Sequence, residues 1–528
     1  MLRRALGLAL AVPLLAASGC MMIGPDYQRP RAPLAQAWID RAEPAISRQA
    51  EPIGAWWESF DDPTLSDLIA QAYRQNPSLQ AAGVRVLEAQ ARRGIAIGTL
   101  FPQGQALVGS YSRVLQSKNI AIPVPDRSFG DLVLGFDAAW ELDIWGRFRR
   151  GIEAADADVL AAVASYDDVL VSLLAEVAAN YVQIRTLQQE LAVAQQNAQL
   201  QRNSYDIARV RYDEGAATAL DPAQAATLLY DTEARIPAIE ARIEGTASTL
   251  SVLLGVPPRR VQDLLGDAQR PIPSPATEVA VGIPADLLRR RPDVRRAERL
   301  LASQSARIGI AKSDLLPHLL LVGEIALNAE SARDLFEGKS ARGFGGPTFR
   351  WDILNYGRIT NNVRVQDARY QALVGDYETT VLRAQADVES AMAAYLGAIR
   401  RTASLTESVV AAQKAVDVVS EQYREGAIDF TAVLLAQDFL VTQESTLATS
   451  RGEVALALVA TYKALGGGWE PFEGRSVVGQ DTAEQMRART RWGALLGERE
   501  QAAGIEAAST GTESDRGWWR WRWWWPQW

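Results

Sequence analysis

The sequence NPSLQAAGVRVLEAQARRGIAIGTLFP at residues 76–102 has a counterpart, RPDVRRAERLLASQSARIGIAKSDLLP, at residues 291–317. Pro77 aligns with Pro292, and the prolines that end the two stretches align as well, each pair 215 positions apart. Three glycines farther along repeat at a spacing of 211: Gly146 with Gly357, Gly215 with Gly426, and Gly255 with Gly466. Because the same signals recur in the same order, the sequence predicts two tandem copies of one structural unit.

Each copy contains a long segment without proline, at residues 147–214 and 358–425. Apolar residues recur there at spacings of 3 and 4, for example at Leu170, Leu174, Val177, Tyr181 and Ile184, and at Val388, Met392, Tyr395 and Ile399. This spacing predicts one apolar seam along a helix that, at 1.5 Å per residue, reaches roughly 100 Å. A Glu-Gly pair follows, and a second helical run ends at Gly255 or Gly466. Each copy is therefore predicted to form a long helical hairpin with its tip at Gly215 or Gly426.

Shorter segments between the helices alternate in the manner of strands. The segment DLVLGFDAAWELD at residues 131–143 places apolar side chains on one face and acidic ones on the other, which is typical of a strand that faces lipid. Two segments of the second copy, at residues 318–328 and 348–353, alternate in the same way. Residues 102–112 are assigned as a strand by repeat position alone. The predicted lipid-facing residues are Leu132, Leu134, Phe136, Trp140, Leu319, Leu321, Phe349 and Trp351.

Four strands in one chain cannot close a barrel, and open strand edges are not tolerated in lipid. The edges are therefore expected to pair with other copies of the chain. Two copies give about eight strands with little lumen, and three give about twelve with room for a channel. Three copies therefore suit a conduit better. The predicted fold class is mainly α with a membrane β-barrel portion, built from two repeats of a helical hairpin plus two strands.

The N-terminus predicts export and lipidation. Two arginines, a short apolar run and two small residues precede Cys20, the one cysteine of the chain. The apolar run is shorter than the roughly 20 residues that span a bilayer, so residues 1–19 are interpreted as a signal peptide. Small residues before the cysteine favour acylation of Cys20. Met21 stands where Asp favours inner-membrane retention, so the outer membrane is the predicted location, with residues 20–63 as a lipidated segment.

Composition excludes several function classes. A net charge of −8 gives no reason to expect nucleic acid as a partner. With one histidine, His318, and one cysteine, the chain offers no Cys/His cluster for a metal and no Cys-His nucleophile pair. We predict no catalytic residues, no metal, no cofactor and no enzyme activity.

Two further segments carry structural expectations. The basic run RRRPDVRRAER at residues 289–299 is interpreted as a solvated helix face, with Pro292 at the helix start. Residues 470–528, which end in WWRWRWWWPQW, are predicted to be a flexible C-terminal extension.

Several motifs together resemble the TolC-like outer-membrane factors, particularly their lipoprotein (NodT-type) branch. The resemblance covers about residues 24–469 and rests on GPDYQRP, WWESFDDPTLSDLIAQAYRQNPSL, GIPADLLRRRPDVRRAE, AKSDLLPHL and YREGAIDFTAVLLAQ. It implies a homotrimer with a 12-stranded barrel in outer-membrane lipid and a helical tunnel through the periplasm. The implied partners are a periplasmic adaptor protein and a proton-driven inner-membrane pump.

The resemblance also implies roles for particular positions. Repeat 1 spans 64–258 and repeat 2 spans 284–469, with a linker at 259–283. Adaptor contact is expected at the periplasmic tips, at Tyr212, Gly215, Ala216, Tyr423, Gly426 and Ala427. Many relatives carry an acid where this chain has Leu435, so the aperture is assigned to Asp221, Asp429, Leu435 or Asp438.

The implied function is passive export of small toxic compounds or drugs. A duct for an ATP-driven protein secretion system and a scaffold without a pore remain alternatives. Cys20 and GPDYQRP favour efflux.

Overall fold

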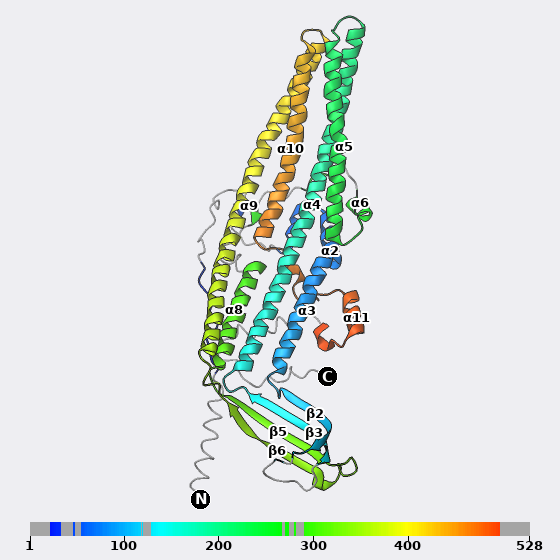
Figure 1. The fold of residues 1–528 in the computed structure, drawn as a ribbon. Coiled ribbons are helices and arrows are strands. Elements are labelled where there is room, and N and C mark those ends of the chain that lie inside the picture. Colours follow the sequence, from blue (N-terminus) through cyan, green and yellow to red (C-terminus); the bar gives the residue numbers. More distant parts are fainter. Residues whose placement is uncertain are drawn as a thin grey trace.

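The structure, a computed structural model, describes residues 22–32, 46–47, 54–117, 119, 128–266, 270–273, 279–280 and 290–496. The chain is elongated. A small sheet lies at one end, and the long helices extend from it to the other end (Figure 1). The signal peptide 1–19, the predicted lipidation site Cys20 and the tryptophan-rich segment 518–528 lie outside the described residues.

The elements confirm the tandem repeat. The first copy contains α3 (Pro77–Gly98), β2 (Gly104–Leu115), β3 (Ser128–Leu142), α4 (Arg147–Asp213) and α5 (Leu220–Leu254). The second contains α8 (Pro292–Ser313), β5 (His318–Ala329), β6 (Ala341–Arg350), α9 (Arg358–Arg424) and α10 (Phe430–Ala464). The long helices α4 and α9 each have 67 residues, and α5 and α10 each have 35.

Shorter elements flank the repeats. Before α3 come the 3₁₀ helix η1 (Trp56–Phe60) and α2 (Pro63–Gln75), and α6 (Arg259–Leu265) follows α5. Strands β1 (Ile46–Ser47) and β4 (Val279–Ala280) form a small parallel pair. Short 3₁₀ turns are η2 (Gly338–Ser340), η3 (Glu470–Phe472) and η4 (Gly493–Leu496), and α11 (Gln480–Arg489) lies between the last two.

The larger sheet has the order β2-β3-β5-β6, with every neighbouring pair antiparallel. Directly paired residues share a face, so the register places the predicted apolar residues of β3, β5 and β6 on the same side. In one row across the sheet, Trp140 pairs with Leu321; in the next, Leu142 pairs with Leu319, which pairs with Phe349. Strands β2 and β6 form the two edges of this sheet.

The expected position of Trp351 within a strand is wrong. Strand β6 ends at Arg350, which pairs with His318, the first residue of β5. The residue before His318 is Pro317, which has no N–H to donate, so the ladder stops there. Trp351 lies just past the strand, and its indole nitrogen donates to the carbonyl of Leu315 at 3.0 Å.

The main core is built around α4. Its buried side chains include Leu174, Val177 and Tyr181, which belong to one hydrophobic cluster with residues of α2, α5, α8, α9 and α10. Trp56 of η1 stacks on Tyr462 of α10 with ring centroids 5.5 Å apart, which ties the N-terminal segment to the end of repeat 2. The core therefore lies at mid-length, between the sheet and the helical tips.

The interpretation of the basic run as a solvated face is wrong for two of its arginines. Arg291 is 9% exposed and pairs with Asp293 and Asp387. The guanidinium of Arg295 lies 4.8 Å from the ring centroid of Trp469 and 3.5 Å from Asp167. Nearby carboxylates, of which Asp167 is buried, and the ring face of Trp469 stabilise these cations away from the solvent.

The expected flexible extension is wrong for residues 470–496. Val478, Ala483, Met486 and Leu496 form a buried cluster with Leu87 of α3, and α11 lies beside α3 in Figure 1. Two buried residues one turn apart, Ala483 and Met486, give α11 an apolar face, and burial of that face holds the segment on α3.

An extended N-terminal segment, residues 22–32, crosses α4 and α8. The Ile23 amide donates to the Trp145 carbonyl at 3.1 Å, and Arg150 contacts Asp26 at 2.8 Å. Gly24 has φ +110°, and a Cβ there would lie 2.4 Å from the Cα of Gly309. The GPDYQRP motif therefore supplies a glycine where the two backbones meet closely.

Within the described part of the chain, no helix combines the length and apolar character needed to cross a bilayer.

Candidate functional site

The two hairpin tips lie side by side at the end of the molecule farthest from the sheet (Figure 1). Gly215 ends the first long helix with φ +77°, and Gly426 ends the second with φ +76°. Each glycine amide donates to the carbonyl three residues earlier, and the next alanine amide donates to the carbonyl five residues earlier. These bonds terminate each right-handed helix at a glycine in the left-handed conformation, which glycine adopts without steric cost.

Three side chains join the tips, and we call them the tip latch: Arg211, Asp221 and Tyr423. The Tyr423 hydroxyl donates to Asp221 Oδ2 at 3.0 Å. Arg211 Nη1 donates to the Tyr423 carbonyl, and its guanidinium lies 4.8 Å from the Tyr423 ring centroid. The latch therefore links the start of α5 and the end of α4 to the end of α9.

Tyr423 is the buried member of the latch, whereas Arg211 and Asp221 are half-buried. Tyr423 is 4% exposed and packs edge-on against Phe430 at 5.2 Å between ring centroids. Burial and the bond to Asp221 raise the pKa of the Tyr423 hydroxyl to about 12. The hydroxyl thus stays protonated near neutral pH and keeps donating.

The predicted tip residues divide into two groups. Tyr212 occupies the position of Tyr423 in the first repeat, yet it is 46% exposed. The structure brings Tyr423 together with Asp221, whereas Tyr212 remains available on the surface. Sequence reasoning missed Arg211, although it directly precedes Tyr212 and its repeat counterpart is Gln422. That difference between repeats was the available signal.

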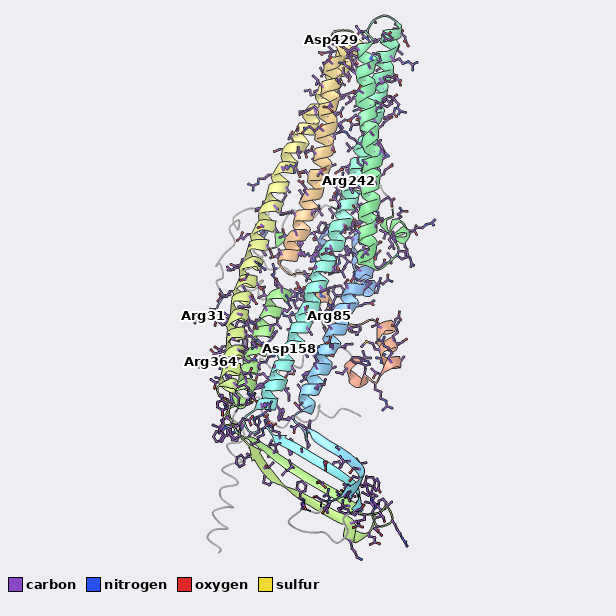
Figure 2. All side chains as sticks on the ribbon, in the orientation of Figure 1. Arg31, Arg85, Asp158, Arg242, Arg364 and Asp429 are labelled. Atoms are coloured by element: carbon purple, nitrogen blue, oxygen red, sulfur yellow. The ribbon has the colours of Figure 1, made fainter. Side chains whose placement is uncertain are left out.

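The predicted aperture residues do not form one cluster. Asp221 belongs to the latch, and Asp429 directly precedes α10 at the tip, where Figure 2 labels it. Leu435 and Asp438 lie farther along α10 on an exposed face that also carries Phe439. Leu435 is 64% exposed and Phe439 is 53% exposed. This face of α10 therefore combines two large apolar side chains with one acid.

Behind the tips, several polar contacts join α4 to α10, and we call these contacts the polar seam. Asn197 donates to Glu444 at 2.5 Å, and Gln437 donates to Ser204 at 2.7 Å. Gln201 is 1% exposed, and its amide has no hydrogen-bond partner. Polar groups can exchange their partners for water, so separating this seam costs less than separating an apolar contact.

The polar seam ends near a close approach of α4 and α10 at Gly452. Glu190 accepts from Thr449 at 2.9 Å and from Arg242 at 3.2 Å; Figure 2 labels Arg242 partway along α5. At Gly452 an added Cβ would lie 2.1 Å from Thr186 Oγ1. Beyond this point, toward the sheet, the helices contact each other through buried apolar residues such as Leu458.

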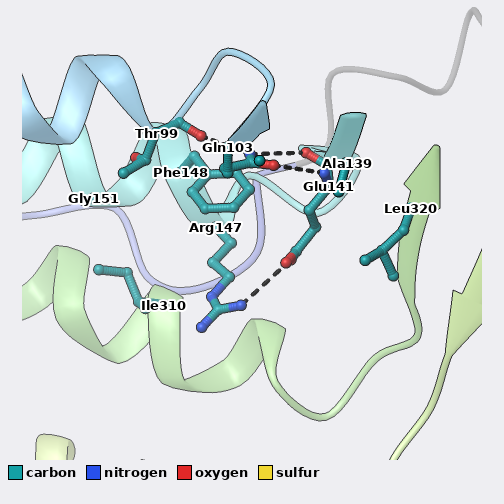
Figure 3. Close-up of a pocket in the computed structure, with 10 residues that line it drawn as sticks. Thr99, Gln103, Ala139, Glu141, Arg147, Phe148, Gly151, Ile310 and Leu320 are labelled. Atoms are coloured by element: carbon teal, nitrogen blue, oxygen red, sulfur yellow. Dashed lines mark hydrogen bonds and ion pairs between the residues drawn. The ribbon is translucent and has the colours of Figure 1, made fainter. Parts of the chain in front are cut away.

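A second polar junction joins the sheet to the helices (Figure 3). Glu141 of β3 accepts from Arg147 of α4 at 3.3 Å and contacts His318 Nδ1 at 2.7 Å. Gln103 accepts from the Glu141 amide at 2.7 Å and donates to the Thr99 carbonyl at 2.7 Å. Thr99, Gln103, Glu141 and Arg147 line a cavity of about 480 Å³. His318 is therefore positioned as a structural partner of Glu141.

Among the residues that the structure describes, no three His, Cys, Asp or Glu side chains are grouped so that they could hold a metal ion.

Comparisons with known proteins agree with this architecture. The profile of the outer membrane efflux protein family matches residues 68–256 and 283–467. Nodulation protein T of Rhizobium leguminosarum bv. viciae is 30% identical over 466 residues, 88% of this chain and 93% of that protein. The pyoverdine export outer membrane protein OpmQ of Pseudomonas putida is 31% identical over 436 residues, 81% of this chain and 90% of that protein.

Solved structures give the same result. The structure of the outer-membrane channel OprN is 32% identical and superposes with a TM-score of 0.79, covering 85% of this chain and all of that one. The resemblance to NodT-type outer-membrane factors is thereby confirmed. The chain belongs to the outer membrane efflux protein family.

Proposed function

We propose that this protein is the outer-membrane duct of a tripartite efflux system. In this role it passes small toxic compounds from a periplasmic adaptor and an inner-membrane pump to the outside. One observation carries the proposal: a sheet with an apolar face and two unpaired edges continues into helical hairpins. The sheet suits lipid, and hairpins built on 67-residue helices extend roughly 100 Å away from it.

The unpaired edges support a homotrimer. Edge β2 of one copy is free to pair with edge β6 of the next, so three four-stranded sheets close a barrel of 12 strands. Closure satisfies the backbone groups of both edges, which lipid cannot do. The lipid-facing residues in this arrangement are those of the apolar sheet face, including Leu134, Phe136 and Leu321.

The anchor proposed at Cys20 fits this placement. The described chain begins at Met22, and Met22 Cα lies 2.9 Å from the position of a Cβ added at Gly146, next to the sheet. This position of Met22 supports a lipid anchor at Cys20, two residues earlier in the sequence. We assign lipidation to Cys20 and outer-membrane location to the whole protein, with the helices in the periplasm.

The tips are proposed as the docking site for the adaptor. The exposed Tyr212 and the backbone turns at Gly215–Ala216 and Gly426–Ala427 form the end surface. The aperture is assigned to the exposed α10 face with Leu435 and Asp438, and to Asp429 near the tip. Asp221 contributes through the latch. We propose a proton-driven pump as the inner-membrane partner and no catalytic activity in this chain.

The named relatives favour efflux over protein secretion. OpmQ is described as a pyoverdine export protein, and a Pseudomonas putida relative that is 28% identical is described as a toluene efflux pump outer membrane protein. Both names specify small molecules. The protein-secretion alternative has no comparable support.

Two experiments test the proposal. In cells that lack their own duct, expression of this chain should lower the accumulation of an efflux dye, and unchanged accumulation contradicts export. For docking, photo-crosslinkers on cysteines at Ala216 and Ala427 should capture one periplasmic protein, identified by mass spectrometry. A cysteine at Ala488, exposed on α11, is the control. Equal capture by the control, or none at the tips, makes the tip assignment wrong.

A further inference from the structure

A cavity of about 530 Å³ lies where four helices meet at mid-length of the molecule. The start of α8, the end of α10 and inner segments of α4 and α9 form its walls. Figure 1 shows these helices converging between the sheet and the tips. The volume lies within the range of about 300–1,000 Å³ that is typical of small-molecule sites.

The charges in this cavity are not balanced pair by pair. Its walls carry three carboxylates, Asp168, Asp293 and Asp387, and two cations, Arg291 and Lys463. Arg291 is fully engaged, because it contacts Asp293 at 2.9 Å and Asp387 at 3.1 Å. Its Nη1 also donates to the carbonyl of Ala464 at 2.6 Å. Two carboxylates thus share one cation.

Lys463 does not supply a direct partner for Asp168. Its ammonium lies 3.9 Å from Glu176, which is not a wall residue of the cavity. Within the described part of the chain, Asp168 makes no hydrogen bond and no ion pair. Burial and the nearby charge of Asp293 raise the pKa of the Asp168 carboxyl, while Arg296, Arg291 and Lys463 lower it from a distance. The cavity therefore presents a carboxylate that lacks a close positive charge.

The remaining walls suit an organic molecule. Ser172, one helical turn after Asp168, and Ser390 of α9 supply hydroxyl groups. Val171, Ala391 and Ala464 supply apolar surface. The carboxylates are not grouped as a metal site among the described residues. A ligand with one cationic group and an apolar body matches both features.

We propose that this cavity binds small organic cations, with Asp168 contacting the cationic group and Val171, Ala391 and Ala464 contacting the apolar part. The inference deepens the proposed function, because it names a class of exported compound, and it rests on that function for its role in the cell. Binding itself is independent of transport and is measurable on the purified protein.

The test uses ethidium, an apolar organic cation, and the full-length detergent-solubilised protein at pH 7.5. Fluorescence anisotropy should show saturable binding, and Asp168→Asn should weaken it about tenfold or more, because a charge-assisted contact is lost. Ser172→Leu, which fills the cavity without changing charge, should weaken binding as well. Unchanged affinity in either variant overturns the proposal.

Two controls separate the site from general charge and from apolar surface. Asp158→Asn changes the same charge on the same helix, but its carboxylate pairs with Arg307 at 2.8 Å, so ethidium affinity should stay unchanged. Asp168→Asn should not weaken the binding of the anionic probe 8-anilinonaphthalene-1-sulfonate. If the variant weakens the binding of both probes equally, the cavity is not a cation site. Loss of export with intact ethidium binding would count against the proposed function alone.

Discussion

Asn76 and Arg291 begin the same helix in the two repeats, and each donates a hydrogen bond to the last turn of the helix that returns from the tip. Asn76 Nδ2 donates to the Leu253 carbonyl at 2.9 Å, and Arg291 Nη1 donates to the Ala464 carbonyl at 2.6 Å. Leu253 and Ala464 are themselves repeat equivalents. Different side chains therefore close the base of each hairpin, at the end away from the tip latch.

Removing the base contact of the first repeat should destabilise the fold. Asn76 also caps α3, because its Oδ1 accepts from the Leu79 amide at 2.8 Å. Asn76→Ala loses both bonds inside a buried site, so we expect a loss of about 1–2 kcal/mol in the free energy of unfolding. Urea titration, monitored by tryptophan fluorescence, measures this free energy. Asn203→Ala, at an exposed position of α4, should change little; an equal loss there means that the cap is not the cause.

Weakening the tip latch should loosen the periplasmic end. Tyr423→Phe deletes the hydroxyl that bonds Asp221 and keeps the ring that Arg211 covers. We expect a higher channel open probability with a stability loss of only about 1 kcal/mol. Tyr212→Phe is the matched control, since this repeat equivalent is exposed. If both variants open the channel equally, the latch does not hold the tips.

The two faces of the sheet should tolerate charge differently. Leu134 pairs with Leu327 on the apolar face, whereas its neighbour Val133 pairs with Asn328 on the other. Leu134→Arg should cost about 2–4 kcal/mol in lipid and reduce insertion into vesicles. Val133→Arg should insert nearly as well as the parent chain. Protection from protease measures insertion. If Leu134→Arg inserts better than Val133→Arg, the face assigned to lipid is wrong.

The half-buried carboxylate of Asp168 should give a stability effect that depends on pH. Its pKa is raised in the folded state, so the carboxylate destabilises the fold where it is charged, above the folded pKa. Asp168→Asn should therefore raise the melting temperature at pH 7. That gain should shrink as the pH falls through the raised pKa and vanish below the ordinary Asp value. Melting curves at several pH values, with Asp158→Asn as the control, measure the change in melting temperature. A gain in melting temperature that is independent of pH contradicts a raised pKa at Asp168.

Much of the architecture could be predicted from local sequence signals. Gly215 and Gly426 mark the tips because glycine permits the positive φ that ends each long helix. The alternation in β3 predicted its apolar face correctly, since a strand exposes successive side chains on opposite sides. The repeat then placed β2, whose own alternation is poor.

The remaining features depend on contacts that local patterns do not contain. Arg291 is buried because the end of α10, 173 positions later, supplies a carbonyl for it. The latch joins Tyr423 to Asp221 across 202 positions. Helix α11 buries only Ala483 and Met486, too few residues for a clear helical pattern. Which faces meet is decided by the tertiary fold, so these sites emerged only from the structure.

Conductance of the trimer in a planar lipid bilayer distinguishes an efflux duct from a protein without a pore. Purified trimers should give stepwise currents, and Tyr423→Phe should raise the fraction of time spent open relative to Tyr212→Phe. Folded trimers that insert into the bilayer and pass no current, with or without the latch, would contradict the assignment of this protein as an efflux duct.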